Sequence, residues 1–237
     1  GGLSYDKSKR QWPNELNVFG ALILIIAIFE ILGAIFMGQS LLFDSRDRFD
    51  SIFNEQRLRI IIIQVAIVGI IALGVTQVII TAGIDLSSGS VLGATAMIAM
   101  SFAQVGEVNG GPNPKAIFGP AFLDLPMVVP IFVGLCCGII AGIVNGVLVA
   151  YSRIPPFIAT LGMMLILKGL SLVISGTRPI YFNDTPGFSE ISRGSLIGEL
   201  IPALPIPNGV LILFIVAAAT AYVLNRTVLG RYCFALG

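Results

Sequence analysis

Residues 127–150 read MVVPIFVGLCCGIIAGIVNGVLVA and contain no charged side chain. An α-helix needs about 20 apolar residues to cross the ~30 Å hydrocarbon layer of a bilayer, and this stretch meets that length. The rest of the chain has the same character, since 56% of its 237 residues are hydrophobic, only 11% are charged and the mean hydropathy is +0.94. A soluble domain carries about 25% charged residues. The sequence therefore predicts an all-α, polytopic helical membrane protein.

Five further apolar segments lie on either side of this span. The expected set is 18–37, about 58–82, about 91–105, about 127–150, 157–174 and 209–224. The third segment is short for a full crossing, and it follows the sequence TAGIDLSSGS at 81–90, in which glycine and serine can unwind a helix. We therefore expect about six spans with a discontinuous segment near residues 82–90. That segment is either a re-entrant break or a short inner loop.

The chain is expected to divide into a polar N-terminal segment, residues 1–17, and a membrane domain, residues 18–237, that is incomplete at its C-terminus. The first span has no small-residue cleavage site, so we expect it to be retained. Basic residues near the span ends are nearly equal in number on the two sides. On the side of the N-terminus, the turn at 151–156 and residues 225–237 hold basic residues and no acidic ones, which favours a cytoplasmic N-terminus and a multi-pass protein of the bacterial inner membrane.

Composition excludes several function classes. The net charge of +1 provides no basic stripe for nucleic acid, so nucleic acid is not an expected partner. Histidine is absent, and the three cysteines, Cys136, Cys137 and Cys233, have neither disulfide nor zinc spacing, so we expect no metal and no cofactor. Motifs of hydrolytic enzymes are absent, and no Gly-Lys pair forms a phosphate-binding loop. The chain is not expected to be an enzyme, and any ATP chemistry must lie on a partner.

Asp85 is the most informative polar residue because it lies between two apolar segments, in the stretch that glycine and serine unwind. Unwound backbone at membrane depth persists only where it is buried in protein or lines a cavity. The Asp85 carboxylate could cap the free amides at the start of the following helix. Alternatively, Asp85 and its hydroxyl neighbours Ser87 and Ser88 contact a polar solute as it passes.

Four more polar residues lie inside apolar spans. Lys168 can extend its ammonium group to the outer interface, pair with Asp85 or Glu30, or contact solute. Glu30 is expected to face other helices or water, or to be protonated. Asn145 and Thr160 are either interhelical hydrogen-bond partners or solute contacts. The candidates for a solute path are therefore Asp85, Ser87, Ser88, Asn145, Thr160 and Lys168.

Glycines recur at four-residue spacing in the span at 127–150. They are Gly134, Gly138, Gly142 and Gly146, and they lie along one stripe of the helix. A stripe without side chains lets a neighbouring helix approach closely, and in lipid such contacts are a main source of helix association. We expect this stripe to be a helix-packing surface.

Three motifs make the chain similar to a known family. They are GIDLSSGS at Gly83–Ser90, PPFIATLGMMLILKG at Pro155–Gly169 and LGRYCFALG at Leu229–Gly237. In this order they resemble the membrane permease of bacterial sugar ABC importers of the ribose, xylose and galactoside type. The resemblance covers residues 58–237, whereas the first 57 residues resemble the family only in holding one span.

The resemblance implies a pore that carries a sugar or polyol from periplasm to cytoplasm. It also implies three protein partners: a second permease copy, a cytoplasmic ATP-binding subunit and a periplasmic solute-binding protein. In such permeases the segment after the LGRY motif docks on the ATPase, so Gly230, Arg231 and Gly237 are expected near the coupling element. The chain stops at Gly237, before that element, and has fewer spans than the family usually has.

Two other functions stay open at the level of sequence. One is an ion-coupled carrier in which Asp85 binds the coupling cation, because secondary carriers use intramembrane carboxylates or broken helices. The other is a membrane scaffold that transports nothing. A neutral sugar needs hydroxyls and amides along its path and few ionised groups, which agrees with the scarcity of charge inside the spans and favours the sugar importer.

Overall fold

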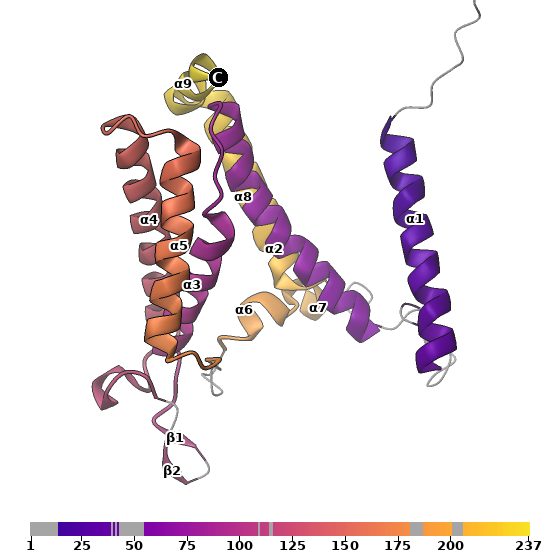
Figure 1. Ribbon diagram of the computed structural model, residues 1–237. Coiled ribbons are helices and arrows are strands. Elements are labelled where there is room, and N and C mark those ends of the chain that lie inside the picture. The colour runs from indigo at the N-terminus through magenta and orange to yellow at the C-terminus, as the bar shows by residue number, and fades with distance from the viewer. Residues whose placement is uncertain are drawn as a thin grey trace, which may run out of the picture. The chain divides into compact units, whose positions relative to one another are not determined.

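The computed structural model describes residues 14–38, 40, 42, 55–108, 110–113, 116–180, 187–200 and 206–237. Most of the predicted cytoplasmic segment, residues 1–17, lies outside these ranges, including Lys7, Lys9 and Arg10. The chain divides into two compact units, residues 1–62 and 63–237, which are described separately. Helix α2 begins in the first unit and ends in the second (Figure 1).

The described residues are mainly helical, as predicted. The helices are α1 (Asn14–Leu32), α2 (Glu55–Ile80), α3 (Ser88–Phe102), α4 (Val128–Ala150), α5 (Pro156–Ser175), α6 (Glu190–Arg193), α7 (Leu196–Leu200), α8 (Asn208–Arg226) and α9 (Val228–Leu236). A π-helical turn η1 (Gly33–Met37) follows α1, and a 3-10 turn η2 (Pro120–Phe122) precedes α4. The strands β1 (Glu107–Val108) and β2 (Gly111–Pro112) pair antiparallel.

Five helical stretches are long and apolar enough to cross a membrane: Leu16–Phe36, Arg57–Ile80, Val128–Ala150, Pro156–Ser175 and Asn208–Arg226. They match five of the six predicted spans to within a few residues. The sixth, α3, has 15 residues and therefore a length of about 22 Å, less than the ~30 Å of the hydrocarbon layer. The prediction of a short third segment is confirmed.

Helix α2 ends at a turn that its last residues close. Ala82 has a φ of 54°, and the Gly83 N–H donates to the Val78 carbonyl at 3.0 Å, which is the backbone pattern of a Schellman end. The chain then runs without helical structure until α3 begins at Ser88. Figure 1 shows this linker turning back from the end of α2 and passing inward before α3 starts. The term "the break" is used below for residues 81–87.

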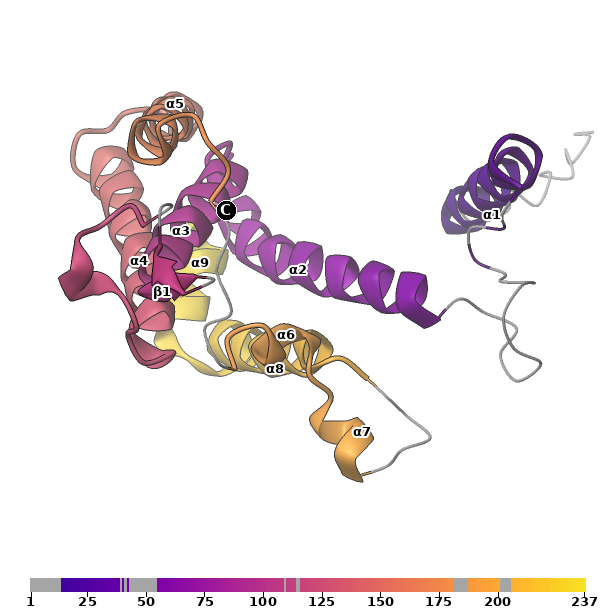
Figure 2. The ribbon, with the colours of Figure 1, turned by 90° about the horizontal axis from the view of Figure 1, so that it is seen from below.

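In the second unit, α3, α4 and α5 pack against one another as a three-helix group. Helix α2 contacts α8, since a Cβ atom on Gly69 would lie 2.9 Å from Leu213 Cδ1. The α4–α5 turn and α9 lie at one end of this unit, whereas the β1–β2 hairpin, α6 and α7 lie at the other (Figures 1 and 2). The basic residues Arg153 and Arg231 therefore share one end.

Several elements in the connections differ from the prediction. The connection between the third and fourth predicted spans contains the short β1–β2 pair, and the connection between the fifth and sixth contains α6 and α7. Helix α9 also was not predicted as a separate helix. All of these elements are short, with the longest, α9, at nine residues, so apolar periodicity over many turns could not reveal them.

The α4 glycines differ in their surroundings. A Cβ atom on Gly134 would lie 3.2 Å from Ala99 Cβ, and one on Gly138 would lie 3.8 Å from Thr95 Cγ2, so the first half of the stripe faces α3. At Gly142 and Gly146, no described atom lies within 4 Å of the same position. The two glycines nearer the start of α4 therefore permit close packing on α3, while the other two face open space.

Replacing Gly134 by leucine is expected to destabilise the detergent-solubilised protein by about 1–3 kcal/mol, because the side chain overpacks the contact with Ala99. Gly142→Leu is the matched control, since it adds the same side chain to the same helix where the position is open. The midpoint of thermal unfolding measures both effects. Equal midpoints for the two variants would contradict close packing of α3 on Gly134.

Candidate functional site

The polar residues of the break form a compact hydrogen-bond cluster. Asp85 Oδ1 accepts the Ser87 backbone N–H at 2.7 Å and the Ser87 hydroxyl at 2.6 Å. Ser87 is the N-cap residue of α3 and is 0% exposed. The carboxylate thus binds the residue before the helix and fixes the conformation of the chain as it enters α3. Both contacts are to the N-cap residue itself, whereas the capping role was expected for the amides of the first turn.

Helix α4 reaches this cluster through Asn145. Its Nδ2 atom donates to Ser87 Oγ at 2.9 Å, so Ser87 Oγ both donates to Asp85 and accepts from Asn145. Asn145 Oδ1 is buried and accepts no hydrogen bond within the described part of the chain. Asn145 Oδ1 is therefore one hydrogen-bond acceptor of the cluster for which the described residues supply no donor.

Helix α5 reaches the break through Thr160, which is 5% exposed. Thr160 Oγ1 accepts the Leu86 N–H at 3.2 Å. Its single hydrogen can go to the Pro156 carbonyl at 2.8 Å or to the Ile84 carbonyl at 3.2 Å. The hydroxyl thus supplies a partner to a backbone amide that no helix or strand satisfies, which is the condition for non-helical backbone at membrane depth.

The position of the cluster along α4 and α5 shows how deep the break lies. Asn145 precedes the end of α4 at Ala150, and Thr160 follows the start of α5 at Pro156. At 1.5 Å per residue, the hydrogen bonds to the break lie about 6–8 Å inward from the α4–α5 turn. Of the two alternatives for residues 82–90, this placement agrees with a re-entrant break.

The other two solute-path candidates are not part of the hydrogen-bond cluster. Lys168 is exposed on α5, about 12 Å further along the helix axis than Thr160. In the part of the chain that the structure describes, Lys168 forms no ion pair with Asp85. Ser88 is the first residue of α3 and is partly exposed, and its hydroxyl makes no hydrogen bond to any described residue.

A second group of hydrogen-bonded polar residues, at the opposite end of α3, was not predicted; Gln104 and Asn113 are buried in it and Asp124 is exposed. The Asp124 N–H donates to the Gln104 carbonyl at 3.0 Å, and Asp124 Oδ1 accepts the Gly106 N–H at 3.0 Å. Asn113 Nδ2 donates to the Val105 carbonyl at 2.9 Å. These bonds close the loop after α3. In the sequence, Asn113 and Asp124 lie among glycines and prolines. That composition indicates a loop but does not indicate which groups these side chains bind.

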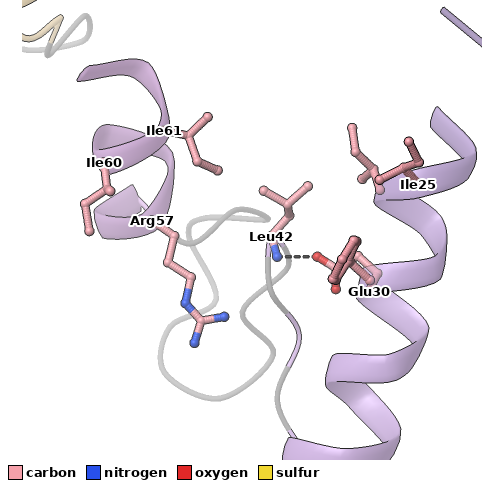
Figure 3. A pocket seen from close by; sticks show the side chains of 8 residues that line it. Ile25, Glu30, Leu42, Arg57, Ile60 and Ile61 are labelled. Carbon is pink, nitrogen blue, oxygen red and sulfur yellow. Dashed lines mark hydrogen bonds between the residues drawn. The ribbon is translucent and has the colours of Figure 1, made fainter. Parts of the chain in front are cut away.

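The first unit contains Glu30, the intramembrane carboxylate of α1. One of its oxygens accepts the Ser40 hydroxyl at 2.7 Å. The other accepts the Leu42 N–H, the bond drawn in Figure 3. The Arg57 Nη1 atom donates to the Ser40 carbonyl at 2.6 Å. Glu30 therefore binds the chain that follows its own helix.

A cavity of about 380 Å³ lies beside Glu30 in the first unit. Its lining is mostly aliphatic and comprises Ile25, Ile26, Phe29, Glu30, Leu42, Arg57, Ile60 and Ile61 (Figure 3). The polar atoms of Glu30 are directed to the backbone and hydroxyl of the following chain. The cavity offers apolar surface and no convergent polar groups that would select a hydrophilic solute.

The three residues expected near a coupling element lie in or beside α9. Gly230 is buried, and a Cβ atom there would collide with the Leu224 carbonyl, so the α8–α9 turn requires glycine. Arg231 is exposed. Gly237 lies against the Ile80 carbonyl at the end of α2. Helix α9 therefore occupies the end of the unit at which α2 turns into the break.

Apolar spans whose polar side chains collect at a broken helix are characteristic of membrane transport proteins. A permease family model, described as the branched-chain amino acid transport system / permease component, matches residues 57–237. The chain belongs to this permease family. The family is described as a component of a transport system.

Relatives with assigned names agree with this membership. The ribose import permease protein of Haemophilus influenzae is 35% identical over 226 residues, covering 94% of this chain and 57% of that protein. The Bacillus subtilis ribose import permease is 39% identical over 73% of this chain and 47% of that protein. The Salmonella typhimurium galactose/methyl galactoside import permease is 31% identical over 98% and 62%.

The chain thus spans 47–62% of the length of these relatives. The resemblance to sugar permeases inferred from the three motifs is confirmed. No solved structure matches the chain.

Thr160→Val is expected to speed amide exchange at Leu86 about fivefold, because the variant keeps the shape of the side chain but removes a hydrogen bond of ~1 kcal/mol. Thr160→Ser keeps the hydroxyl and should exchange like the wild type. Hydrogen–deuterium exchange of the peptide over residues 83–90, followed by mass spectrometry, measures the rate.

Thr76→Val is the control for this experiment, since the Thr76 hydroxyl donates only to Ala72 of its own helix at 2.7 Å. If Thr160→Val left the exchange of the 83–90 peptide unchanged, or if Thr76→Val accelerated it equally, Thr160 would not hold the break.

Proposed function

We propose that the chain forms the transmembrane pore of an ATP-driven importer that carries a sugar or polyol from the periplasm to the cytoplasm. The observation that carries the proposal is its similarity, over most of the chain, to import permeases named for ribose, fructose and galactose. The re-entrant break supports it, because discontinuous helices form solute sites in membrane transporters.

The chemistry of the spans favours a sugar over an amino acid, although the family description names branched-chain amino acids. An amino acid carries both a carboxylate and an ammonium group, and each needs a charged or strongly polar partner out of water. Away from their ends, the described membrane spans contain few such groups, chiefly Glu30 and Lys168, and the break adds Asp85. A neutral solute with many hydroxyls requires no paired charges.

Energy and delivery are assigned to partner chains. No Gly-Lys pair for a phosphate-binding loop occurs in the sequence, so ATP hydrolysis belongs to a cytoplasmic ATP-binding subunit. A periplasmic solute-binding protein delivers the sugar, and a second permease copy completes the pore. Residues 1–17 are proposed to be cytoplasmic and residues 18–237 to form the membrane domain in the inner membrane. The end with the α4–α5 turn and α9 then faces the cytoplasm.

The full-length permease, reconstituted in liposomes with its ATP-binding and solute-binding partners, is expected to take up a sugar only when ATP is supplied. Radiolabelled ribose, fructose, galactose and leucine provide the panel, and a hydrolysis-deficient ATP-binding subunit provides the control. Uptake of leucine in place of the sugars would contradict the assigned solute class. Uptake driven by an ion gradient without ATP would favour the ion-coupled carrier in which Asp85 binds the cation.

Arg231→Ala is expected to lower ATP-dependent uptake at least about fivefold while leaving the unfolding temperature unchanged, because Arg231 is exposed on α9 at the proposed cytoplasmic end. Loss of a charge pair between Arg231 and the ATP-binding subunit, contributing ~1 kcal/mol or more, would account for the fivefold decrease. Arg178→Ala is the control, as Arg178 is equally exposed but lies after α5, near the opposite end. Equal losses for the two variants would remove the argument for coupling through α9.

A further inference from the structure

We infer that the residues of the polar cluster at the break have two different roles. Asp85 Oδ2 contacts the solute, and Ser87, Asn145 and Thr160 hold Asp85 in position. This inference rests on the proposed function, and it goes further by separating one contact residue from three positioning residues. It also names the feature of the solute that is recognised, which is a hydroxyl group.

In the three positioning residues, the polar side-chain atoms are either hydrogen-bonded or buried. Ser87 is 0% exposed, and its hydroxyl is occupied by Asp85 and Asn145. Thr160 is 5% exposed, and its hydroxyl serves the backbone of the break and of its own helix. Asn145 uses its Nδ2 atom on Ser87, and its Oδ1 atom is buried.

Asp85 differs from these residues in both exposure and bonding. Its side chain is partly exposed, and both of its hydrogen bonds, at 2.7 Å and 2.6 Å, converge on Oδ1. No described residue donates to Oδ2. One carboxylate oxygen is therefore anchored to the break, and the other remains able to accept a hydrogen bond.

The balance of donors and acceptors indicates what Oδ2 receives. The cluster has spare acceptors, Asp85 Oδ2 and the buried Asn145 Oδ1. Each donor side chain within it already makes a hydrogen bond, namely the Ser87 hydroxyl, Asn145 Nδ2 and the Thr160 hydroxyl. A carboxylate oxygen binds hydroxyl hydrogens through strong, short charge-assisted bonds. A site built to bind a hydroxyl rejects an analogue without it far more strongly than an apolar pocket rejects a missing methylene. Asp85 is thus assigned as a specificity-determining residue for one or more sugar hydroxyls.

The anchoring contacts come from two helices that are distant in sequence from Asp85. Asn145 on α4 acts through the Ser87 hydroxyl, and Thr160 on α5 acts through the Leu86 N–H. Loss of either contact leaves the carboxylate present but free to move. Variants at Asn145 and Thr160 should therefore weaken discrimination between sugars, and conservative replacements that keep the hydrogen bond should restore it.

The test uses the full-length permease in liposomes with its partners, at saturating binding protein, so that uptake reports passage through the pore. The solute is whichever of ribose, fructose and galactose the wild type takes up fastest, together with its monodeoxy analogues. For at least one hydroxyl, the wild type should prefer the parent sugar about tenfold or more, and Asp85→Asn should reduce that preference at least threefold. Size-exclusion profiles establish that each variant is folded.

Matched variants separate contact from positioning. Thr160→Val and Asn145→Leu should lower the preference, whereas Thr160→Ser should retain it. Asp124→Asn is the control for loss of a carboxylate, since Asp124 also accepts a backbone N–H but lies in the loop at the opposite end of α3. Thr76→Val is the control for loss of a hydroxyl inside a span.

The outcomes distinguish this inference from the proposed function. If the wild type takes up sugar with ATP but Asp85→Asn keeps the full preference for the parent sugar, the inference is wrong and the proposed function stands. If the wild type takes up no sugar, both are wrong. A preference lost in Asp85→Asn and unchanged in Thr160→Val would contradict the positioning role of Thr160.

Discussion

Backbone amides and carbonyls without helical partners cannot persist inside a bilayer unless other groups satisfy them, and this constraint governs the chain between α2 and α3. Residues 84–86 of the break make no helical hydrogen bonds within the described chain, yet the break lies about 6–8 Å inward from the α4–α5 turn. Side chains take the place of the missing bonds. Asp85 satisfies the Ser87 N–H, and Thr160 satisfies the Leu86 N–H.

The same contacts explain why α3 can be too short to span the membrane alone. The N-cap residue of α3, Ser87, accepts a hydrogen bond from Asn145 of α4. The break before α3 donates a hydrogen bond from the Leu86 N–H to Thr160 of α5. Further along, α3 packs closely on Gly134 and Gly138 of α4. The three helices are thus linked both by polar contacts at the start of α3 and by small-residue packing along it, which are the two main means of helix association in lipid.

Much of this architecture could be predicted from sequence, because about 20 consecutive apolar residues have few alternatives to a membrane span. Asp85, Asn145 and Thr160 could be singled out for the same reason, as polar groups in apolar runs. The hydrogen bonds that link these residues through the break could not be predicted, because they depend on how α4 and α5 are rotated and shifted against the break. Lys168 shows the limit of the argument: its residue type indicated a candidate, but it lies about 12 Å from the cluster along α5. The polar contacts of Asn113 and Asp124 in the loop after α3 were missed because loop composition does not specify which carbonyls and amides meet.

The central claim is that side chains from α4 and α5 hold the break in place. A double-mutant cycle between Ser87→Ala and Asn145→Leu, measured as the free energy of unfolding in detergent, tests it most directly. The bond predicts a coupling energy of about 0.5–2 kcal/mol, the range found for hydrogen bonds between membrane helices. If the two substitutions were instead additive to within about 0.3 kcal/mol, Asn145 would not hold Ser87, and the account of the break would be contradicted.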